Sequence, residues 1–288
     1  MSLLEKTKAN INALKSIWQK CFYLLRTGQL RTVLLSKLKM AINHRRHKNS
    51  YVKTKIFFMH IPKTGGTSIY HMLSQKFYSY RLNKIKTGNK QHSIRAYECI
   101  AGHIPYSKLR QQFPGYNYKI IVFTRDPINR FVSSIKHRKR VRAPQNTTNQ
   151  HGQARELSIL DYTQTPKGKY KLHLQLLFLA KANGYHGKDL NQAYQEAKQF
   201  IHQDNVTLCL TEQMDTSIKL LNKQFNACIP KVLKVNTSKQ HRHTVDDKEI
   251  TTAHDTLCQL TSLDYQLHED CKKAFFQSCE ENGISTHN

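Results

Sequence analysis

The sequence has few acidic residues, no long apolar run and no secretory signal. Asp and Glu number 19 against 46 Lys and Arg in 288 residues, which gives a formal net charge of +27. The longest apolar candidate, residues 172–180, indicates a core helix, because a membrane-spanning helix needs about 18 apolar residues. No apolar stretch with a small-residue cleavage site follows Met1. These absences argue against a membrane-spanning or secreted protein.

Cysteine and histidine are present without the spacing of a structural or metal site. The seven cysteines are an odd number and include no C-x-x-C, so neither a disulfide framework nor a zinc site is indicated. Cys99 and Cys209 lie in apolar runs, and we expect them to be buried. The run His241-Arg242-His243 lacks a second ligand pair, so no metal is expected in the mechanism.

Residues 1–50 differ in composition from the rest and are expected to form a basic helical extension. They contain 11 Lys or Arg and a single acidic residue, Glu5. Apolar residues recur at helical spacing on both sides of Gly28, which predicts two amphipathic helices. Such helices can lie on an anionic membrane surface or pack against the main domain, and the pattern leaves both open. The main domain is expected to span residues 51–288.

From residue 51, short apolar runs alternate with helical patterns, which predicts an α/β fold with a central parallel sheet. The expected strands are 55–60, 98–103, 119–124, 206–211 and 231–235. The expected helices are 67–77, 127–137, 171–182, 189–202, 215–225 and 264–279. Ligands of such sheets bind beyond the carboxyl ends of the strands, so the chemistry should follow His60, His103, Thr124 and Thr211.

The first expected strand leads into the motif H-I-P-K-T-G-G-T-S, His60 to Ser68. Two glycines allow a tight turn that exposes successive N–H groups, and the helix that follows adds a positive N-terminus. This is a phosphate cradle on physical grounds. It is not a Walker A loop, because Lys63 precedes the glycines. Lys63 is therefore expected to contact a phosphate or a leaving oxygen without a metal.

A second motif follows the third expected strand and reads R-D-P-I-N-R-F-V-S, Arg125 to Ser133. Arg125 stands at the strand end, and Ser133 follows two helical turns later, so both side chains could face one anion. A guanidinium and a hydroxyl suit a second phosphate. The alternative for Arg125 is a salt bridge with Asp126 or another acid. Two anion sites after two strands are a specific combination.

These motifs resemble those of the sulfotransferases that use 3′-phosphoadenosine 5′-phosphosulfate (PAPS). P-K-T-G-G-T-S resembles the 5′-phosphosulfate loop of that family, and R-D-P-x-x-R-x-x-S resembles its 3′-phosphate site. The K-T-G-G-T-S form is similar to the carbohydrate branch, which includes heparan sulfate 2-O- and 6-O-sulfotransferases and bacterial relatives. Leu210-Thr211-Glu212, with Cys209 in place of the usual Gly, and Lys234-Val235-Asn236 extend the resemblance over about residues 53–280.

The resemblance implies a P-loop-like, three-layer α/β domain that transfers a sulfuryl group from PAPS to a carbohydrate hydroxyl. It implies that Arg125 and Ser133 hold the 3′-phosphate and that His103, in A-G-H-I-P-Y, is the general base. Lys63 would neutralise charge on the bridging oxygen. His60 would orient the loop, and Glu212 would have a structural rather than an acid-base role. The residues expected to hold the 5′-phosphosulfate are Lys63, Thr64, Gly65, Gly66, Thr67 and Ser68.

The acceptor is expected to be an anionic or neutral glycan. The basic run Lys136 to Arg142 would either bind a polyanionic sugar chain or form a solvated loop. Because the sequence shows no luminal anchor, we expect a cytoplasmic protein of bacterial type, with the Golgi lumen as the alternative. A peripheral membrane position through residues 1–50 stays open. Two other classes remain: a magnesium-dependent nucleotide kinase and a non-catalytic polyanion-binding protein. A nucleic-acid partner is not expected, because no known nucleic-acid-binding module is visible.

Overall fold

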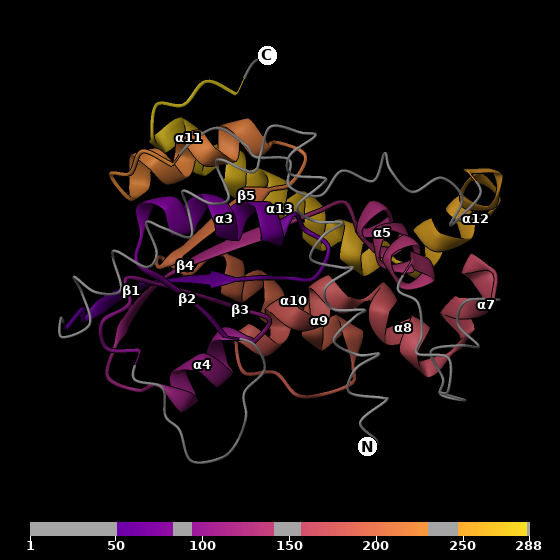
Figure 1. Ribbon diagram of the computed structural model, residues 1–288. Helices are drawn as coiled ribbons and strands as arrows, with labels where there is room; N and C mark the ends of the chain where they lie inside the picture. Colours follow the sequence, from indigo (N-terminus) through magenta and orange to yellow (C-terminus); the bar gives the residue numbers. More distant parts are fainter. Residues whose placement is uncertain (1–50, 83–93, 141–156, 230–246, 287–288) are drawn as a thin grey trace, which may run out of the picture. The chain divides into compact units, whose positions relative to one another are not determined.

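The computed structural model describes residues 51–82, 94–140, 157–229 and 247–286 (Figure 1). The N-terminal extension, the expected strand 231–235 and the Lys234-Val235-Asn236 segment lie outside these residues. Within them, the fold is α/β with a five-stranded, all-parallel sheet in the order β2-β3-β1-β4-β5. The strands are β1 (Thr54–Met59), β2 (Ser79–Leu82), β3 (Cys99–Gly102), β4 (Asn117–Thr124) and β5 (Val206–Leu210).

Helices cover both faces of this sheet, which explains why the strand sequences are apolar on both sides. One face packs on α3 (Gly66–Lys76) and α11 (Met214–Gln224), and its core includes Phe58, Phe123 and Leu221. The other face packs on α4 (Tyr106–Gln112), α9 (Leu174–Ala182) and α10 (Leu190–Ile201), and its core includes Phe57 and Phe200. Figure 1 shows these two helical layers above and below the strands. The helix α13 (Ser262–Glu281) contributes to the second core through Leu267 and Cys271.

Four further helices form a lobe with a core of its own at one end of the sheet (Figure 1). They are α5 (Pro127–Arg140), α7 (Ile159–Gln164), α8 (Pro166–Leu172) and α12 (Asp247–Leu260). Their buried side chains include Phe131, Tyr162 and Leu257. Because α5 begins directly after β4, the lobe is attached to the carboxyl edge of the sheet, where ligands of parallel sheets bind.

The structure confirms the fold class and four expected strands, and it corrects the helix expected at 171–182. That segment contains the end of α8 and the whole of α9, separated by His173. The strand β2 and the helices α4, α7 and α12 were not expected from the sequence. Cys99 and Cys209 are fully buried, as predicted. Among the residues described, no helix has both the length and the apolar character needed to cross a membrane.

Candidate active site

The loop between β1 and α3 has a backbone shape that few residues adopt. Lys63 and Gly65 both have left-handed backbone angles, with φ values of 77° and 76°. A non-glycine residue in this conformation costs roughly 1–2 kcal/mol, so the surrounding contacts must hold Lys63 there. Gly65 is the N-cap of α3. No side chain caps that end of the helix, and its first turn contains no acidic residue. The positive end of the helix dipole therefore faces the loop, and no acidic residue of the first turn of α3 neutralises it.

Thr64 stabilises the β1–α3 loop through a buried hydrogen bond of its side chain. Its side chain is fully buried, and its hydroxyl donates to the carbonyl of Ile61 at 2.9 Å. The hydroxyl of Thr211, directly after β5, lies 3.4 Å from the Thr64 carbonyl and donates to the Thr124 carbonyl at 2.8 Å. The Thr64 side chain thus stabilises the loop, and only its backbone remains to contact an anion.

Gly66 is required by the packing of His60 under the loop. A Cβ atom at Gly66 would lie 1.8 Å from Nε2 of His60, which is far shorter than a van der Waals contact, so any larger residue would clash with the ring. The His60 ring is stacked on Phe58 and is 8% exposed. Burial and, to a lesser extent, the charges of His103, Arg81 and Lys63 together lower the pKa of His60 to about 3. His60 is therefore uncharged at neutral pH and packs under the loop, and the role expected for it, to orient the loop, stays a prediction.

His103 follows β3 and lies against His60, with ring centroids 4.1 Å apart. Nδ1 of His103 is 2.8 Å from the His60 carbonyl oxygen. A carbonyl can only accept, so Nδ1 carries the proton and Nε2 keeps its lone pair. Desolvation on the packed side lowers the pKa of His103. The hydrogen bond to the His60 carbonyl raises the pKa in part, and the positive charges of Arg81 and Lys171 lower it. His103 is exposed and neutral, in the tautomer that a general base needs.

Arg125 connects the two sequence motifs. It follows β4, and its Nη1 donates to the carbonyl of Lys63 at 3.2 Å. This bond holds the strained residue of the β1–α3 loop and places the guanidinium beside that loop. Within the described ranges Arg125 forms no ion pair with a carboxylate, so the salt-bridge alternative finds no support there. Ser133 lies two turns into α5 and is half-buried.

Side chains from two other elements fix the backbone that carries Arg125. Gln175 on α9, 1% exposed, accepts from the Arg125 N–H at 3.0 Å and donates to the Arg125 carbonyl at 3.0 Å. Glu212 accepts from the Asp126 N–H at 2.9 Å. The structural role expected for Glu212 thus takes the form of a contact with the start of α5 rather than a cap on its own helix. Asp126 itself caps α5 by accepting from the N–H of Asn129 at 2.7 Å.

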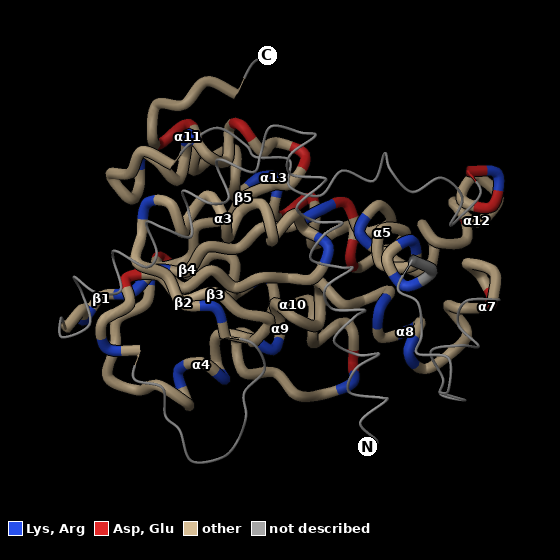
Figure 2. Tube along the Cα trace, viewed as in Figure 1, with Lys and Arg blue, Asp and Glu red and all other residues tan. Residues whose placement is uncertain are grey.

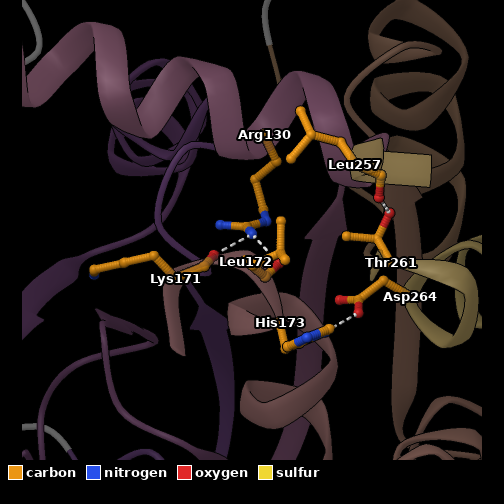
Figure 3. Close-up of polar contacts among 7 residues, drawn as sticks. All are labelled: Arg130, Lys171, Leu172, His173, Leu257, Thr261 and Asp264. Atoms are coloured by element: carbon orange, nitrogen blue, oxygen red, sulfur yellow. Dashed lines mark hydrogen bonds and ion pairs between the residues drawn. The ribbon is translucent and has the colours of Figure 1, made fainter. Parts of the chain in front are cut away.

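Arg130, five residues after Arg125, lies buried between α5 and the junction of α8 and α9 (Figure 3). Its Nη2 donates to the carbonyls of Lys171 at 2.6 Å and Leu172 at 2.8 Å. Burial lowers the pKa of Arg130 to about 10, and the charge of Asp264 opposes the shift. Asp264, on α13, also accepts from Nδ1 of His173 at 2.7 Å. The α8–α9 junction is therefore held from both sides, by α5 and by α13.

Three residues of this site were missed from the sequence. Gln175 stands alone as a polar residue among the buried side chains of α9, and such an isolated amide was the available signal. Arg81 lies on the short edge strand β2, and its side chain is over the ring of Tyr70 at 5.4 Å. Lys171 lies in the last turn of α8, where the sequence predicted the start of a single helix, 171–182. For Arg81 and Lys171, no motif or pattern in the neighbouring sequence indicated a place in the site.

A parallel sheet with a glycine-containing loop after its central strand and an arginine after the neighbouring strand is a P-loop-like α/β fold. The particular family follows from comparison with known proteins. A sequence model of the sulfotransferase family matches residues 50–269, more than half of the chain, and the chain belongs to that family. It is also 31% identical, over 88 residues, to a protein-tyrosine sulfotransferase of Arabidopsis thaliana. That match covers 30% of this chain and 17% of the Arabidopsis protein.

Membership of the sulfotransferase family implies PAPS as the sulfuryl donor. The residues present fit such a donor, since an uncapped helix N-terminus, Lys63 and Arg125 together suit an anion with two separated phosphate groups. Within the described residues no group of three or more His, Cys, Asp or Glu side chains is arranged to hold a metal ion.

Proposed function

We propose that the protein is a PAPS-dependent carbohydrate O-sulfotransferase. The observation that carries the proposal is the bond from Arg125 to the Lys63 carbonyl, with His103 on the other side of the same loop. The loop suits the 5′-phosphosulfate, and Arg125 with Ser133 suits the 3′-phosphate. The K-T-G-G-T-S form of the loop favours a carbohydrate acceptor.

The residues of the site can divide the reaction between them. When bound, PAPS supplies a sulfuryl group whose bond to the phosphate oxygen breaks as the acceptor oxygen forms a new bond to sulfur. Nε2 of His103 takes the proton of the acceptor hydroxyl, because Nδ1 is already committed to the His60 carbonyl. The Lys63 ammonium and the α3 N-terminus stabilise the negative charge that develops on the leaving phosphate.

A second candidate acceptor is a tyrosine side chain of a protein. It is favoured by the name of the Arabidopsis relative, although that match covers a small part of both proteins. A phenol is more acidic than a sugar hydroxyl and needs less help from a base. Loss of His103 should therefore be less damaging to transfer onto tyrosine than to transfer onto a sugar.

The basic N-terminal extension, residues 1–50, suits contact with a membrane surface. We infer from the sequence that the 11 basic residues of 1–50 bring the enzyme to an anionic membrane surface. Binding of the full chain to vesicles with and without anionic lipid tests this, and equal binding to both would contradict it.

The first experiment is a calorimetric titration with adenosine 3′,5′-bisphosphate, without magnesium, against ADP and ATP. Binding that requires the 3′-phosphate supports a PAPS site. A preference for magnesium-ATP would support a kinase and overturn the proposal. Transfer of label from PAPS to a glycan library or to tyrosine peptides then decides the acceptor, and labelling of peptides alone would overturn the carbohydrate assignment.

A further inference from the structure

A single residue, His173, joins α8 to α9 and sets the direction in which α9 begins. Its backbone N–H donates to the carbonyl of Lys169 at 3.3 Å and closes α8, whereas its carbonyl accepts from the N–H of Leu177 at 2.9 Å and opens α9. The imidazole does not cap α9. The side chain is therefore free of its own helices, and whatever holds it also fixes the start of α9.

A carboxylate of the C-terminal helix α13 holds this imidazole (Figure 3). Nδ1 of His173 donates to Oδ2 of Asp264 at 2.7 Å, and the side chains are 15% and 1% exposed. The sequences of α5, α8 and α9 contain no Asp or Glu. Figure 2 shows Lys and Arg positions recurring along α5 and α8. The carboxylate at this junction thus comes from a helix distant in sequence.

The polar groups around the junction are not arranged for stability alone. Among the residues described, Oδ1 of Asp264 is buried without a hydrogen-bond partner, and so are Nε and Nη1 of Arg130 on the other side of the junction. Buried polar groups without partners cost free energy, and an apolar pair can often replace a buried polar one without loss. What an apolar pair lacks is direction. A short hydrogen bond fixes the orientation of the His173 ring.

The start of α9 carries Gln175, which holds the backbone of Arg125 through two hydrogen bonds. The contacts close a ring. Arg125 leads into α5, and Arg130 on α5 donates to the last carbonyls of α8. From there the chain passes through His173 to Gln175 and back to Arg125. Because each step is a hydrogen bond or continuous backbone, a shift of His173 is transmitted to Arg125.

We propose that His173 and Asp264 are positioning residues for the 3′-phosphate of the nucleotide. Asp264 orients His173, and His173 sets the start of α9. Gln175 then holds Arg125 where its guanidinium can meet the phosphate. This inference rests on the proposed function, because it takes Arg125 as a ligand of the 3′-phosphate. It adds α13 to the elements that determine nucleotide affinity.

Calorimetric titration of the full chain with adenosine 3′,5′-bisphosphate and with ADP tests the inference. His173→Leu and Asp264→Leu each remove the hydrogen bond and keep an apolar side chain in its place. Each should raise the Kd for adenosine 3′,5′-bisphosphate about fivefold, which corresponds to about 1 kcal/mol, the usual net contribution of one hydrogen bond. The Kd for ADP, which has no 3′-phosphate, should change little.

Conservative variants and a matched control separate the hydrogen bond from general effects. His173→Asn keeps an amide donor and Asp264→Asn keeps a carbonyl acceptor, so both should bind the nucleotide as the wild type does. The control is the exposed pair of His254 and Asp255 on α12, 3.4 Å apart, where His254→Leu should leave both affinities unchanged. In a Gln175→Ala background, His173→Leu should cause no further loss of affinity, because both act through one contact.

A purely structural role gives a different pattern. The inference is overturned if His173→Leu lowers the melting temperature yet binds both nucleotides as the wild type does, or weakens both equally. A wild type that binds ADP as tightly as adenosine 3′,5′-bisphosphate would instead refute the proposed donor site. If Asp264→Leu does not fold, His173→Leu, at a partly exposed position, decides the matter through hydrogen exchange of the Arg125 amide. That exchange should be faster than in His254→Leu, and equal exchange would overturn the inference.

Discussion

Replacement of Gln175 tests whether a buried amide positions the nucleotide site. Gln175→Ala removes both hydrogen bonds to the backbone of Arg125, each 3.0 Å long. A net hydrogen bond contributes about 1 kcal/mol, and a buried backbone group left without a partner costs about 1–3 kcal/mol. We therefore expect the free energy of unfolding to fall by about 2–4 kcal/mol. The freed backbone should also let the Arg125 guanidinium move away from the 3′-phosphate.

The binding assay distinguishes a positioning role from a purely structural one. Calorimetry should show that Gln175→Ala raises the Kd for adenosine 3′,5′-bisphosphate roughly tenfold, about 1.4 kcal/mol, with little change for ADP. In an Arg125→Ala background, Gln175→Ala should cause no further loss of affinity, because the two residues act through one contact. The exposed Gln192→Ala is the control. The reasoning is refuted if Gln175→Ala unfolds more easily yet binds both nucleotides as the wild type does.

Four further predictions concern the base, its support and the buried arginine. His103→Gln should slow sulfuryl transfer by about 10²- to 10⁴-fold. Since the pKa of His103 is lowered from 6.5, the wild-type rate should stay constant above pH 6.5 and fall only in more acidic buffer. Steady-state rates of both proteins across the pH range check the two predictions. Gly66→Ala should destabilise the fold by about 1–3 kcal/mol, because its Cβ meets His60, and adding His60→Ala should recover part of the loss in thermal unfolding. The pKa of His60 is about 3 in the folded state, so between pH 6.5 and pH 3 only the unfolded chain binds a proton there. The free energy of unfolding should therefore decline from pH 6.5 toward pH 3. His60→Gln should flatten this decline in denaturant titrations at several pH values, and an unchanged decline would contradict the prediction. Arg130→Met should cost about 1–3 kcal/mol, because the carbonyls of Lys171 and Leu172 lose their donor, and a double-mutant cycle in urea with Asp264→Asn measures whether the two charges also interact.

The sequence predicts the centre of this fold better than its edges. The runs that became β1, β3, β4 and β5 are apolar because helices cover both faces of the sheet, and that leaves a clear signal. The strand β2 has the sequence Ser-Tyr-Arg-Leu and is an edge strand, so it has one neighbour and little apolar character. The break at His173 could not be predicted either. It depends on Asp264 and Arg130, which are distant in sequence.

The candidate site shows the same division between local and tertiary information. The glycine turn and the Arg125 motif are local signals, and each could be read from a few residues. The buried orientation of the Thr64 hydroxyl and the Gln175 bonds to Arg125 depend on packing between elements that no short motif encodes. Lys55 illustrates the limit: it is fully buried, and its ammonium donates to the carbonyl oxygens of Arg95 and Tyr97, partners about 40 residues away that no local pattern reveals.

The strand order places His103 and Arg125 on opposite sides of one loop. The central strand β1 pairs with β3 on one side and β4 on the other, and Met59 is in register with both Gly102 and Val122. Neighbouring strands are about 4.8 Å apart, so the ends of β3 and β4 are separated by roughly 10 Å with the β1 loop between them. His103 therefore stands on one side of Lys63 and Arg125 on the other. Under the proposed function, the acceptor would reach the loop from the β3 side, beside His103, and the nucleotide from the β4 side, beside Arg125.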